Sequence, residues 1–395
     1  MLLSFGLLFL VGLSMAYISQ QIKLPRIIGM LFSGIILGPY VLNLLDNELL
    51  SISSHLREMA LIIILIKAGL TLNINDLRKV GRPAFLMSFL PASFEVMAYF
   101  IFAPLILEIS HTDALLMGAV LAAVSPAIVV PRMVNLIDKG YGTNKSIPQL
   151  ILAGASCDDV FVIVLFTTFS AMALGQGIKV TDFMGIPISI ILGVVIGASA
   201  GVLFSKFCEY FQNRNSVKVI IILAIAFILA GIEDLIYLPY SGLLAIISMA
   251  CAYKIKSLPI IISELSIKFG ELWIVAEVIL FVLVGTVMDI NYMLYMGIPA
   301  VVMIFIGLCI RTIGVVLSLV GTEINSKERL FCILVYLPKA TVQAAIGAIP
   351  LSMGISSGKI ILSVSILSII ITAPLGAIAI DMSYKRLLEK VAHQS

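Results

Sequence analysis

The sequence predicts an all-α polytopic membrane protein with about 13 transmembrane helices. Hydrophobic residues make up 61% of its 395 residues and charged residues only 12%, with a mean hydropathy of +1.15. An ordinary soluble domain has about 25% charged residues. Since one bilayer span takes about 20 mostly apolar residues, the chain is long enough for roughly a dozen spans. Apolar runs, basic loops and buried charges specify this prediction further.

Polar breaks divide the chain into thirteen apolar runs, which are the expected spans. They cover residues 2–19, 25–44, 59–72, 84–108, 113–137, 147–174, 183–211, 217–235, 238–254, 270–288, 294–320, 328–353 and 357–380. The first run lacks a basic n-region and a small-residue cleavage site, so we interpret it as a span and expect no cleavable signal peptide. The fifth and twelfth runs contain internal prolines, which predict broken helices.

The basic residues are distributed unequally between alternate loops. Nineteen of the 25 lysines and arginines fall in one set of loops and the C-terminal tail, and three fall in the other set. Cytoplasmic loops carry an excess of Lys and Arg. This asymmetry predicts an outside N-terminus, a cytoplasmic C-terminus and an odd number of spans. The net charge of +3 then reflects membrane orientation, and we expect membrane lipids but no nucleic acid as partners.

The remaining three basic residues and several acids fall within the apolar runs. Ionisable groups inside a membrane usually face a cavity or a partner and mark an ion pathway. Those within the spans are Lys67, Glu95, Asp158, Asp159, Glu277, Arg311 and Lys339. Lys67 lies near the end of a short span, where a lysine can extend to the interface. For Glu95 and Arg311 a purely structural ion pair is the simplest interpretation, and Glu277 is a second-tier candidate that could modulate the site.

Two of these acids, Asp158 and Asp159, are adjacent in "GASCDDVF". A carboxylate at the centre of a bilayer helix costs about 2.5–3.5 kcal/mol on insertion scales. Consecutive helical residues point about 100° apart, so one can face a water-filled cavity and the other a neighbouring helix. Such a coupled pair can hold protons or a small cation. Since all three histidines fall in predicted loops or the tail, any transported proton must be carried by a carboxylate or a lysine.

The chain resembles itself at a long and nearly constant offset. Gly69 pairs with Gly285 at 216, Pro25 with Pro239 at 214, and Pro126 with Pro338 at 212. A shift by seven spans gives two copies of opposite orientation, as in inverted-repeat transporters. We expect one transmembrane domain, 1–395, made of a first repeat over about 1–174, a linking helix over about 183–211 and a second repeat over about 217–380.

The two proline-broken runs occupy corresponding positions in these repeats. Corresponding broken helices mark a binding site near the membrane midplane, because freed backbone groups are tolerated where they line a cavity. Ser125 supplies a hydroxyl at the first break and Lys339 a cation at the second. Ser156 and Thr341 are further plausible neighbours of the aspartate pair, although small residues in packed membrane helices need no function.

Four segments, "AAVSPAIVVPRM", "GYGTNKSIPQLILAGASCDDVF", "YLPKATVQAAIGAIPL" and "ILSIIITAPLGAIAI", resemble the monovalent cation/proton antiporter superfamily. The similarity is greatest to its two-aspartate branch, and within it to sodium/hydrogen exchanger subfamily B and bacterial relatives. It implies a core domain that moves against a dimerisation domain, a homodimer, and exchange of Na⁺ or Li⁺ for H⁺ by elevator-like alternating access. No cofactor and no enzymatic activity are implied. The short tails favour a bacterial plasma membrane, with a role in sodium and pH homeostasis.

The resemblance also implies residue roles. Asp159 is the expected cation and proton carrier, with Asp158 beside it, so that both are the expected ligands of Na⁺ or Li⁺. Glu95 and Arg311 are the expected structural ion pair, and Lys339 is the expected neighbour of Asp158. Arginine stands at 311 where many two-aspartate relatives carry lysine, and it cannot be a second proton carrier because it stays protonated. The proton stoichiometry therefore remains open.

Other functions fit the same sequence less well. A passive cation channel or uniporter, including a K⁺-selective one, could use the same acids, but the sequence has no TVGYG-like carbonyl filter. An intramembrane aspartyl protease needs two converging carboxylates, whereas adjacent helical residues diverge. A transporter of organic anions on a similar scaffold is a further alternative.

Overall fold

The structure, a computed structural model, describes residues 1–71, 81–174, 180–210, 214–235 and 240–390. Within these ranges the side chains of Ser156 and of most residues in 180–190, 233–235 and 290–295 are outside the description. The described residues form helices, with one isolated β-bridge between Tyr141 and Lys390. The expected all-helical class is therefore confirmed for this part of the chain.

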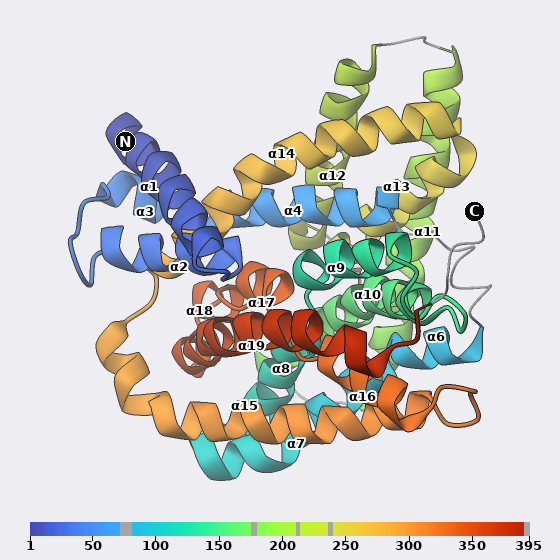
Figure 1. Cartoon of the computed structure of the whole chain (residues 1–395). Coiled ribbons are helices and arrows are strands. Elements are labelled where there is room, and N and C mark those ends of the chain that lie inside the picture. The colour runs from blue at the N-terminus through green and yellow to red at the C-terminus, as the bar shows by residue number, and fades with distance from the viewer. Residues whose placement is uncertain (72–80, 175–179, 211–213, 236–239, 391–395) are drawn as a thin grey trace. The chain divides into compact units, whose positions relative to one another are not determined.

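The helices belong to two compact units. The first unit contains residues 1–50, 73–174 and 281–395, and its helices are α1 (Leu2–Gln21), α2 (Arg26–Leu37), α3 (Asn47–Ser51, at the boundary), α6 (Arg82–Met87), α7 (Leu90–Leu107), α8 (His111–Ala122), α9 (Pro126–Asp138), α10 (Ile147–Ala173), α15 (Ile290–Ser318), α16 (Ser326–Val335), α17 (Thr341–Ile346), α18 (Ile349–Ser352) and α19 (Gly358–Leu387). The second contains α4 (Ser53–Thr71), α11 (Val180–Tyr210), α12 (Asn215–Leu235), α13 (Gly242–Lys256) and α14 (Pro259–Thr286) up to Leu280 (Figure 1).

Eight helical segments in the described part are long and apolar enough to cross a membrane. They are Leu2–Gln21, Arg82–Leu107, His111–Asp138, Ile147–Ala173, Ile191–Tyr210, Asn215–Ile232, Met296–Ser318 and Gly358–Leu387. Two shorter apolar helical segments, Arg26–Leu37 and Thr341–Ser352, accompany them. The chain is thus an integral membrane protein with several apolar helices.

Two helices begin earlier than the hydropathy predicted. α14 begins at Pro259 rather than near 270, and α4 begins at Ser53 rather than near 59. Arg57, which precedes residue 59 and was counted among the three basic residues of the less basic set of loops, therefore lies inside α4 and is only 7% exposed. Its assignment to a loop was wrong. Hydropathy locates the apolar part of a helix, but polar residues can continue the same helix beyond that part. Proline at the first helical position favours a helix start, which explains the start of α14.

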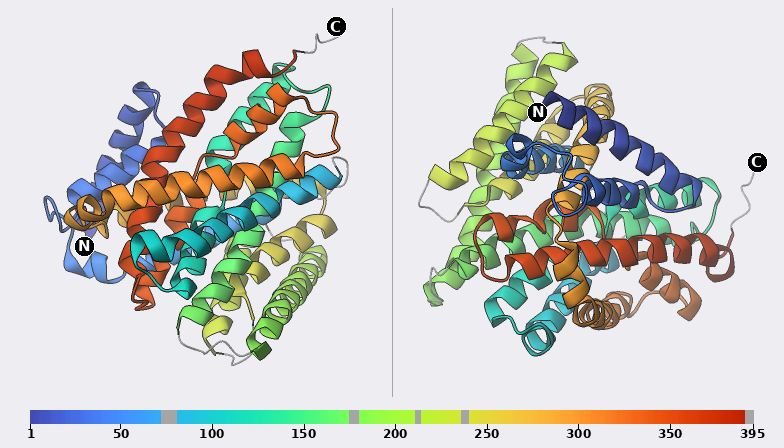
Figure 2. Two further views of the ribbon diagram at one scale, coloured as in Figure 1. Left: turned by 90° about the horizontal axis from the view of Figure 1, so that it is seen from below. Right: turned by 90° about the vertical axis from the view of Figure 1, so that its left-hand side faces the viewer.

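α7 and α15 pack along each other in the first unit (Figure 1; Figure 2). A Cβ atom at Gly314 of α15 would lie 2.7 Å from the Cα of Pro91 in α7, so only glycine permits this approach. Small residues allow membrane helices to approach closely in this way. The close packing matters because α7 carries Glu95 and α15 carries Arg311.

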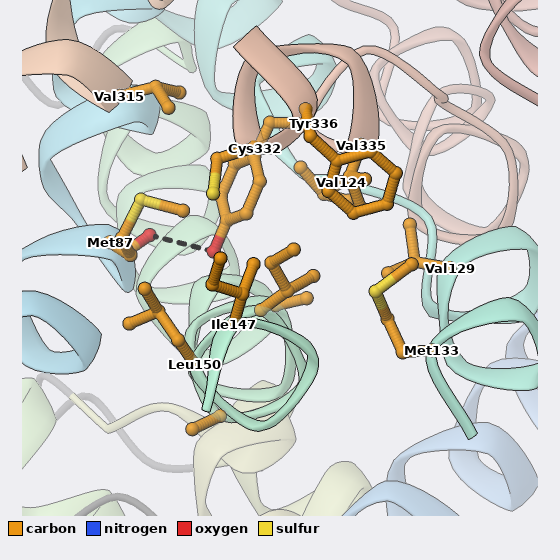
Figure 3. Packing of buried hydrophobic residues seen from close by; sticks show 14 of the residues in the cluster. Met87, Val124, Val129, Met133, Ile147, Leu150, Val315, Cys332, Val335 and Tyr336 are labelled. Atoms are coloured by element: carbon orange, nitrogen blue, oxygen red, sulfur yellow. Dashed lines mark hydrogen bonds between the residues drawn. The ribbon is translucent and has the colours of Figure 1, made fainter. Parts of the chain in front are cut away.

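A buried apolar cluster surrounds the first turns of α10 (Figure 3). Tyr336, next to the second helix break, lies in this cluster and donates its hydroxyl hydrogen to the Met87 carbonyl at 3.4 Å. The Tyr336 hydroxyl also packs so closely against Gly154 that a Cβ there would overlap it. Because Gly154 precedes Asp158 by one turn, this contact positions the helix that carries the aspartate pair.

Candidate ion-binding site

Two broken helices meet at the centre of the first unit. α8 ends at Ala122 and α9 begins at Pro126, while α16 ends at Val335 and α17 begins at Thr341. These breaks confirm the interruptions predicted from proline, which lacks an N–H and cannot continue a helix from the preceding turn. The Ser125 N–H donates to the Pro338 carbonyl at 2.9 Å. Each break thus supplies a backbone partner to the other.

The aspartate pair lies on α10 beside the first break. Asp158 is fully buried, and its Oδ2 accepts a hydrogen bond from the Val124 N–H at 2.8 Å. Asp159 is partly buried and, one residue on, projects from a different side of the helix. Within the described residues, Oδ1 of Asp158 and Oδ1 of Asp159 are both buried and lack a hydrogen-bond partner. A buried carboxylate oxygen in this state is suited to a proton or a cation.

Four charged side chains form a buried cluster next to this pair. Arg311 Nη1 lies 2.7 Å from Glu95 Oε2, and Arg311 Nη2 lies 3.4 Å from Asp158 Oδ2. Lys339 Nζ lies 2.7 Å from Glu95 Oε1. With these four groups ionised, two cations balance the carboxylates of Glu95 and Asp158. Asp159 makes no ion pair among the described residues.

The position of Lys339 differs from the expected one. The resemblance implied Lys339 beside Asp158, but its ammonium pairs with Glu95, and Arg311 is the cation that contacts Asp158. The physical reason is that Glu95 Oε2 accepts hydrogen bonds from both Arg311 Nη1 and Lys339 Nζ, while Lys339 also donates to the Leu121 carbonyl. Arg311 has a planar fork of donors that can reach two carboxylates at once.

The carbonyls at the end of α8 are bound by side chains from the second half of the chain. Leu121 accepts from Lys339, Ala122 from Arg311, and Ala123 from Gln343 Nε2 at 2.8 Å. The last carbonyls of a helix lack helical partners and carry partial negative charge. The two cations and the amide donor therefore complement the C-terminal end of α8.

Gln343 is a site residue that the sequence reasoning missed. It is 1% exposed and lies one turn after Lys339 on the second broken segment. The signal was present, because Gln343 is a polar residue within an apolar run and belongs to "LPKATVQ", the segment that matched the first break.

The other expected site residues are placed as follows. The Ser125 hydroxyl is buried at the first break and has no hydrogen-bond partner in the described part of the chain, and Thr341 is buried at the start of α17. The Ser156 side chain lies outside the described residues. Glu277 belongs to the second unit, where it attracts Lys67 electrostatically, and Lys67 Nζ lies 5.5 Å from the Trp273 ring centroid. Glu277 is thus part of a different charged group.

No three His, Cys, Asp or Glu side chains gather closely enough to hold a metal ion anywhere in the described ranges. The aspartate pair offers two carboxylates, so further ligands of a small cation would be hydroxyl oxygens or water. So few oxygen ligands suit a transported, partly hydrated cation better than a permanently bound metal ion. The two buried carboxylate oxygens without hydrogen-bond partners in the described part of the chain are suited to bind a proton or a small cation.

The sequence matches a known protein family and several curated relatives. Residues 6–383 match the family described as "Sodium/hydrogen exchanger, transmembrane". Human sodium/hydrogen exchanger 9B2 is 32% identical over 403 aligned residues, covering 94% of this chain and 71% of that protein. Human sodium/hydrogen exchanger 9B1 is 30% identical, covering 93% of this chain and 73% of that protein.

The fold also matches a solved structure. The sodium proton antiporter MjNhaP1 from Methanocaldococcus jannaschii at pH 8 superposes with a TM-score of 0.84 over 98% of this chain and 99% of that chain, at 20% identity. The related proteins are exchangers of sodium ions and protons, which are transporters rather than enzymes and need no cofactor. With the family match spanning nearly the whole sequence, this chain belongs to the transmembrane sodium/hydrogen exchanger family.

Proposed function

We propose that this chain is a secondary antiporter in which Na⁺ or Li⁺ competes with H⁺ for Asp159. The observation that carries the proposal is the contrast between the two aspartates. Asp158 is held by Val124 and Arg311, whereas Asp159 has a buried Oδ1 with no hydrogen-bond partner and no ion pair among the described residues. A carboxylate that the protein leaves uncompensated needs a ligand from solution.

Competition for one carboxylate couples the two ions. The loaded site is neutralised by either a proton or a cation, and only the neutralised site crosses the membrane at low cost. Na⁺ leaving on one side therefore requires a proton to load there before the site returns. Several other buried oxygens near the breaks also lack a hydrogen-bond partner in the described part of the chain: Ser125 Oγ, Asp158 Oδ1, Glu95 Oε1 and Gln343 Oε1. Ser125 Oγ, at the first break, and Asp158 Oδ1, beside Asp159 on α10, are the proposed additional ligands.

Glu95, Arg311 and Lys339 supply the fixed electrostatic surroundings. Arg311 keeps its charge throughout, and together with Lys339 it balances Glu95 and Asp158. The net charge near Asp159 therefore changes mainly with what Asp159 binds. Thr341 and Ser156 are proposed supporting residues, and Glu277, in the other unit, is a proposed modulator.

We further propose an elevator-like cycle on an inverted-repeat scaffold of about 13 spans. The repeats are 1–174 and 217–380, linked by a helix over 183–211. One observation supports this proposal: in the first unit a long helix follows each broken helix, α10 after α8 and α9, and α19 after α16, α17 and α18. That unit is the proposed moving core. A homodimer, an outside N-terminus, a cytoplasmic C-terminus and a bacterial plasma membrane are proposed with it.

Proteoliposomes test the function directly. An imposed pH gradient should drive Na⁺ and Li⁺ flux in the wild type, Asp159→Asn should abolish it, and Asp158→Asn should reduce it. Asp113→Asn is the matched control, because Asp113 is a buried aspartate of the same unit that binds Ser357 at 2.6 Å, away from the breaks. Full pH-driven flux by Asp159→Asn would refute the assignment of the carrier.

The same preparation separates exchange from passive conduction. An antiporter moves protons against Na⁺, so Na⁺ uptake should remove protons from the lumen and make it alkaline, at a fixed ratio of protons to Na⁺. Repeating the measurement with K⁺ and under an imposed voltage gives the ion preference and the stoichiometry. Cation flux without proton counterflow would instead indicate a channel or uniporter.

A further inference from the structure

The peptide group between Ala123 and Val124 is held at both ends. Its carbonyl oxygen accepts a hydrogen bond from Gln343 Nε2 at 2.8 Å, and its N–H donates to Asp158 Oδ2 at 2.8 Å. A peptide group is planar, so the direction of its carbonyl determines the direction of its N–H. Gln343 and Asp158, which belong to different helices, are therefore connected through one rigid backbone unit.

The orientation of the Gln343 amide follows from its partners. Its NH₂ group lies 2.8 Å from the Ala123 carbonyl and 3.4 Å from the Leu121 carbonyl. Only the NH₂ end of a carboxamide can donate to a carbonyl. Gln343 is 1% exposed, so bulk solvent has little access to its hydrogen bonds. The Gln343 side chain thus fixes the orientation of the Ala123–Val124 peptide plane at the first break, in addition to filling space.

The connection has an electronic and a geometric consequence at Asp158. A carbonyl that accepts a hydrogen bond polarises its peptide group and strengthens the N–H as a donor. Val124 and Arg311 Nη2 both bind Oδ2, while Oδ1 is buried and has no partner in the described part of the structure. All stabilising contacts of the carboxylate therefore fall on one oxygen, which leaves the other available.

We propose that Gln343 is a positioning residue for Asp158. Through the Ala123–Val124 peptide it fixes Oδ2, so that Oδ1 is the oxygen presented to the transported cation. This inference rests on the proposed function. Gln343, a residue of the second broken helix, thereby orients the Asp158 carboxylate, which lies beside the first broken helix.

The test measures Na⁺ affinity on the full chain with the isosteric change Gln343→Met. Groups that orient a metal ligand typically contribute 10–100-fold to affinity, so Gln343→Met should raise the Na⁺ KM and the Kd from Na⁺-dependent thermal stabilisation by about tenfold. The maximal rate should change far less. Gln149→Met is the matched control, because Gln149 is a partly buried glutamine of α10 whose Oε1 also lacks a partner in the described structure.

A double-mutant cycle distinguishes positioning from simple packing. With Asp158→Asn already present, Gln343→Met should change the Na⁺ Kd by less than about twofold, because coupled residues are not additive. An equal effect in both backgrounds, or an unchanged Kd in Gln343→Met, overturns the proposal. Loss of Na⁺ stabilisation in Asp159→Asn tests the proposed function separately and does not depend on Gln343.

A backbone substitution supplies an independent arm. Replacing Val124 by its α-hydroxy acid removes the N–H and keeps the side chain, and it should raise the Na⁺ Kd as Gln343→Met does. This measurement decides the matter if Gln343→Met does not fold or if Asp158→Asn no longer responds to Na⁺. A Val124 ester with wild-type Na⁺ affinity overturns the proposal.

Discussion

Arg311 and Glu95 lie 216 positions apart in the chain, yet the guanidinium and the carboxylate are 2.7 Å apart and almost wholly buried. The pair joins α7 to α15 and, through Lys339 and Asp158, extends into a four-residue charge cluster. Because each carboxylate in the cluster is shared by or adjacent to a cation, removing one member affects the others.

Glu95→Gln should strongly destabilise the protein. The change leaves Arg311 and Lys339 with one carboxylate between them, and breaking a buried ion pair by removing one partner costs about 3–5 kcal/mol. Thermal unfolding in detergent micelles measures the loss. Adding Lys339→Met to Glu95→Gln should recover part of it by removing the surplus cation. The exposed Glu108→Gln serves as control, and an unaltered melting temperature in Glu95→Gln would contradict the charge-cluster interpretation.

Gly154→Ala should destabilise the α10 packing by about 1–3 kcal/mol, as overpacking of a dense core usually does. The new Cβ would overlap the Tyr336 hydroxyl and lie 2.9 Å from Met87 Cβ. Gly270→Ala is the matched control, because Gly270 lies within α14 with no atom within 4 Å of an added Cβ. Replacing glycine by alanine in an open helix position stabilises it by about 0.5–1 kcal/mol, so the two variants should shift the melting temperature in opposite directions.

Lys145→Met should destabilise the junction between α10 and α16 at neutral pH. Lys145 Nζ lies 2.8 Å from Glu328 Oε2, and the Glu328 side chain is fully buried. The hydrogen bond to Glu328 raises the pKa of Lys145 above its ordinary value of 10.5. The lysine therefore contributes its full stabilisation below that value and loses it as the pH rises through the raised pKa.

Melting temperatures of wild type and Lys145→Met between pH 7 and 11 check this sign. The difference should stay constant up to about pH 10 and shrink above it. Lys139→Met changes an exposed lysine in the same loop and should show no such trend. A difference that grows with rising pH would exclude the ion pair as its source.

Leu388→Ala should release the segment that follows α19 from the loop before α10. Leu388 is 5% exposed, and the adjoining Glu389 carbonyl accepts from the Gly142 N–H at 2.8 Å. Leucine to alanine in a core costs about 2–5 kcal/mol. Hydrogen exchange should increase at residues 384–390 and 141–145 together, whereas Met382→Ala, at a 74% exposed position, should leave it unchanged.

The helical class, the two proline breaks and the buried ionisable residues could be predicted because each depends on local sequence. The partners of those residues could not. Lys339 was expected beside Asp158, and its pairing with Glu95 depends on how closely α7, α15 and the second break pack together. Gln343 was visible as a polar residue in an apolar run, but its hydrogen bond to the Ala123 carbonyl depends on tertiary packing and could not be predicted. The predicted start of α14 was wrong because hydropathy identifies only the apolar part of a helix, whereas the helix itself begins earlier, at Pro259.

The engaged carbonyls at the end of α8 set the kind of coordination that the site can offer. Leu121, Ala122 and Ala123 already accept from an ammonium, a guanidinium and an amide, and Pro338 accepts from the opposite break. A passing cation would have to displace these donors to gain a backbone ligand. The ligands of a cation in the proposed site would therefore be carboxylate oxygens, hydroxyl oxygens and water, and the charge density of a carboxylate favours small hard ions. Discrimination here would follow from ligand strength, unlike in pores lined by rings of carbonyls.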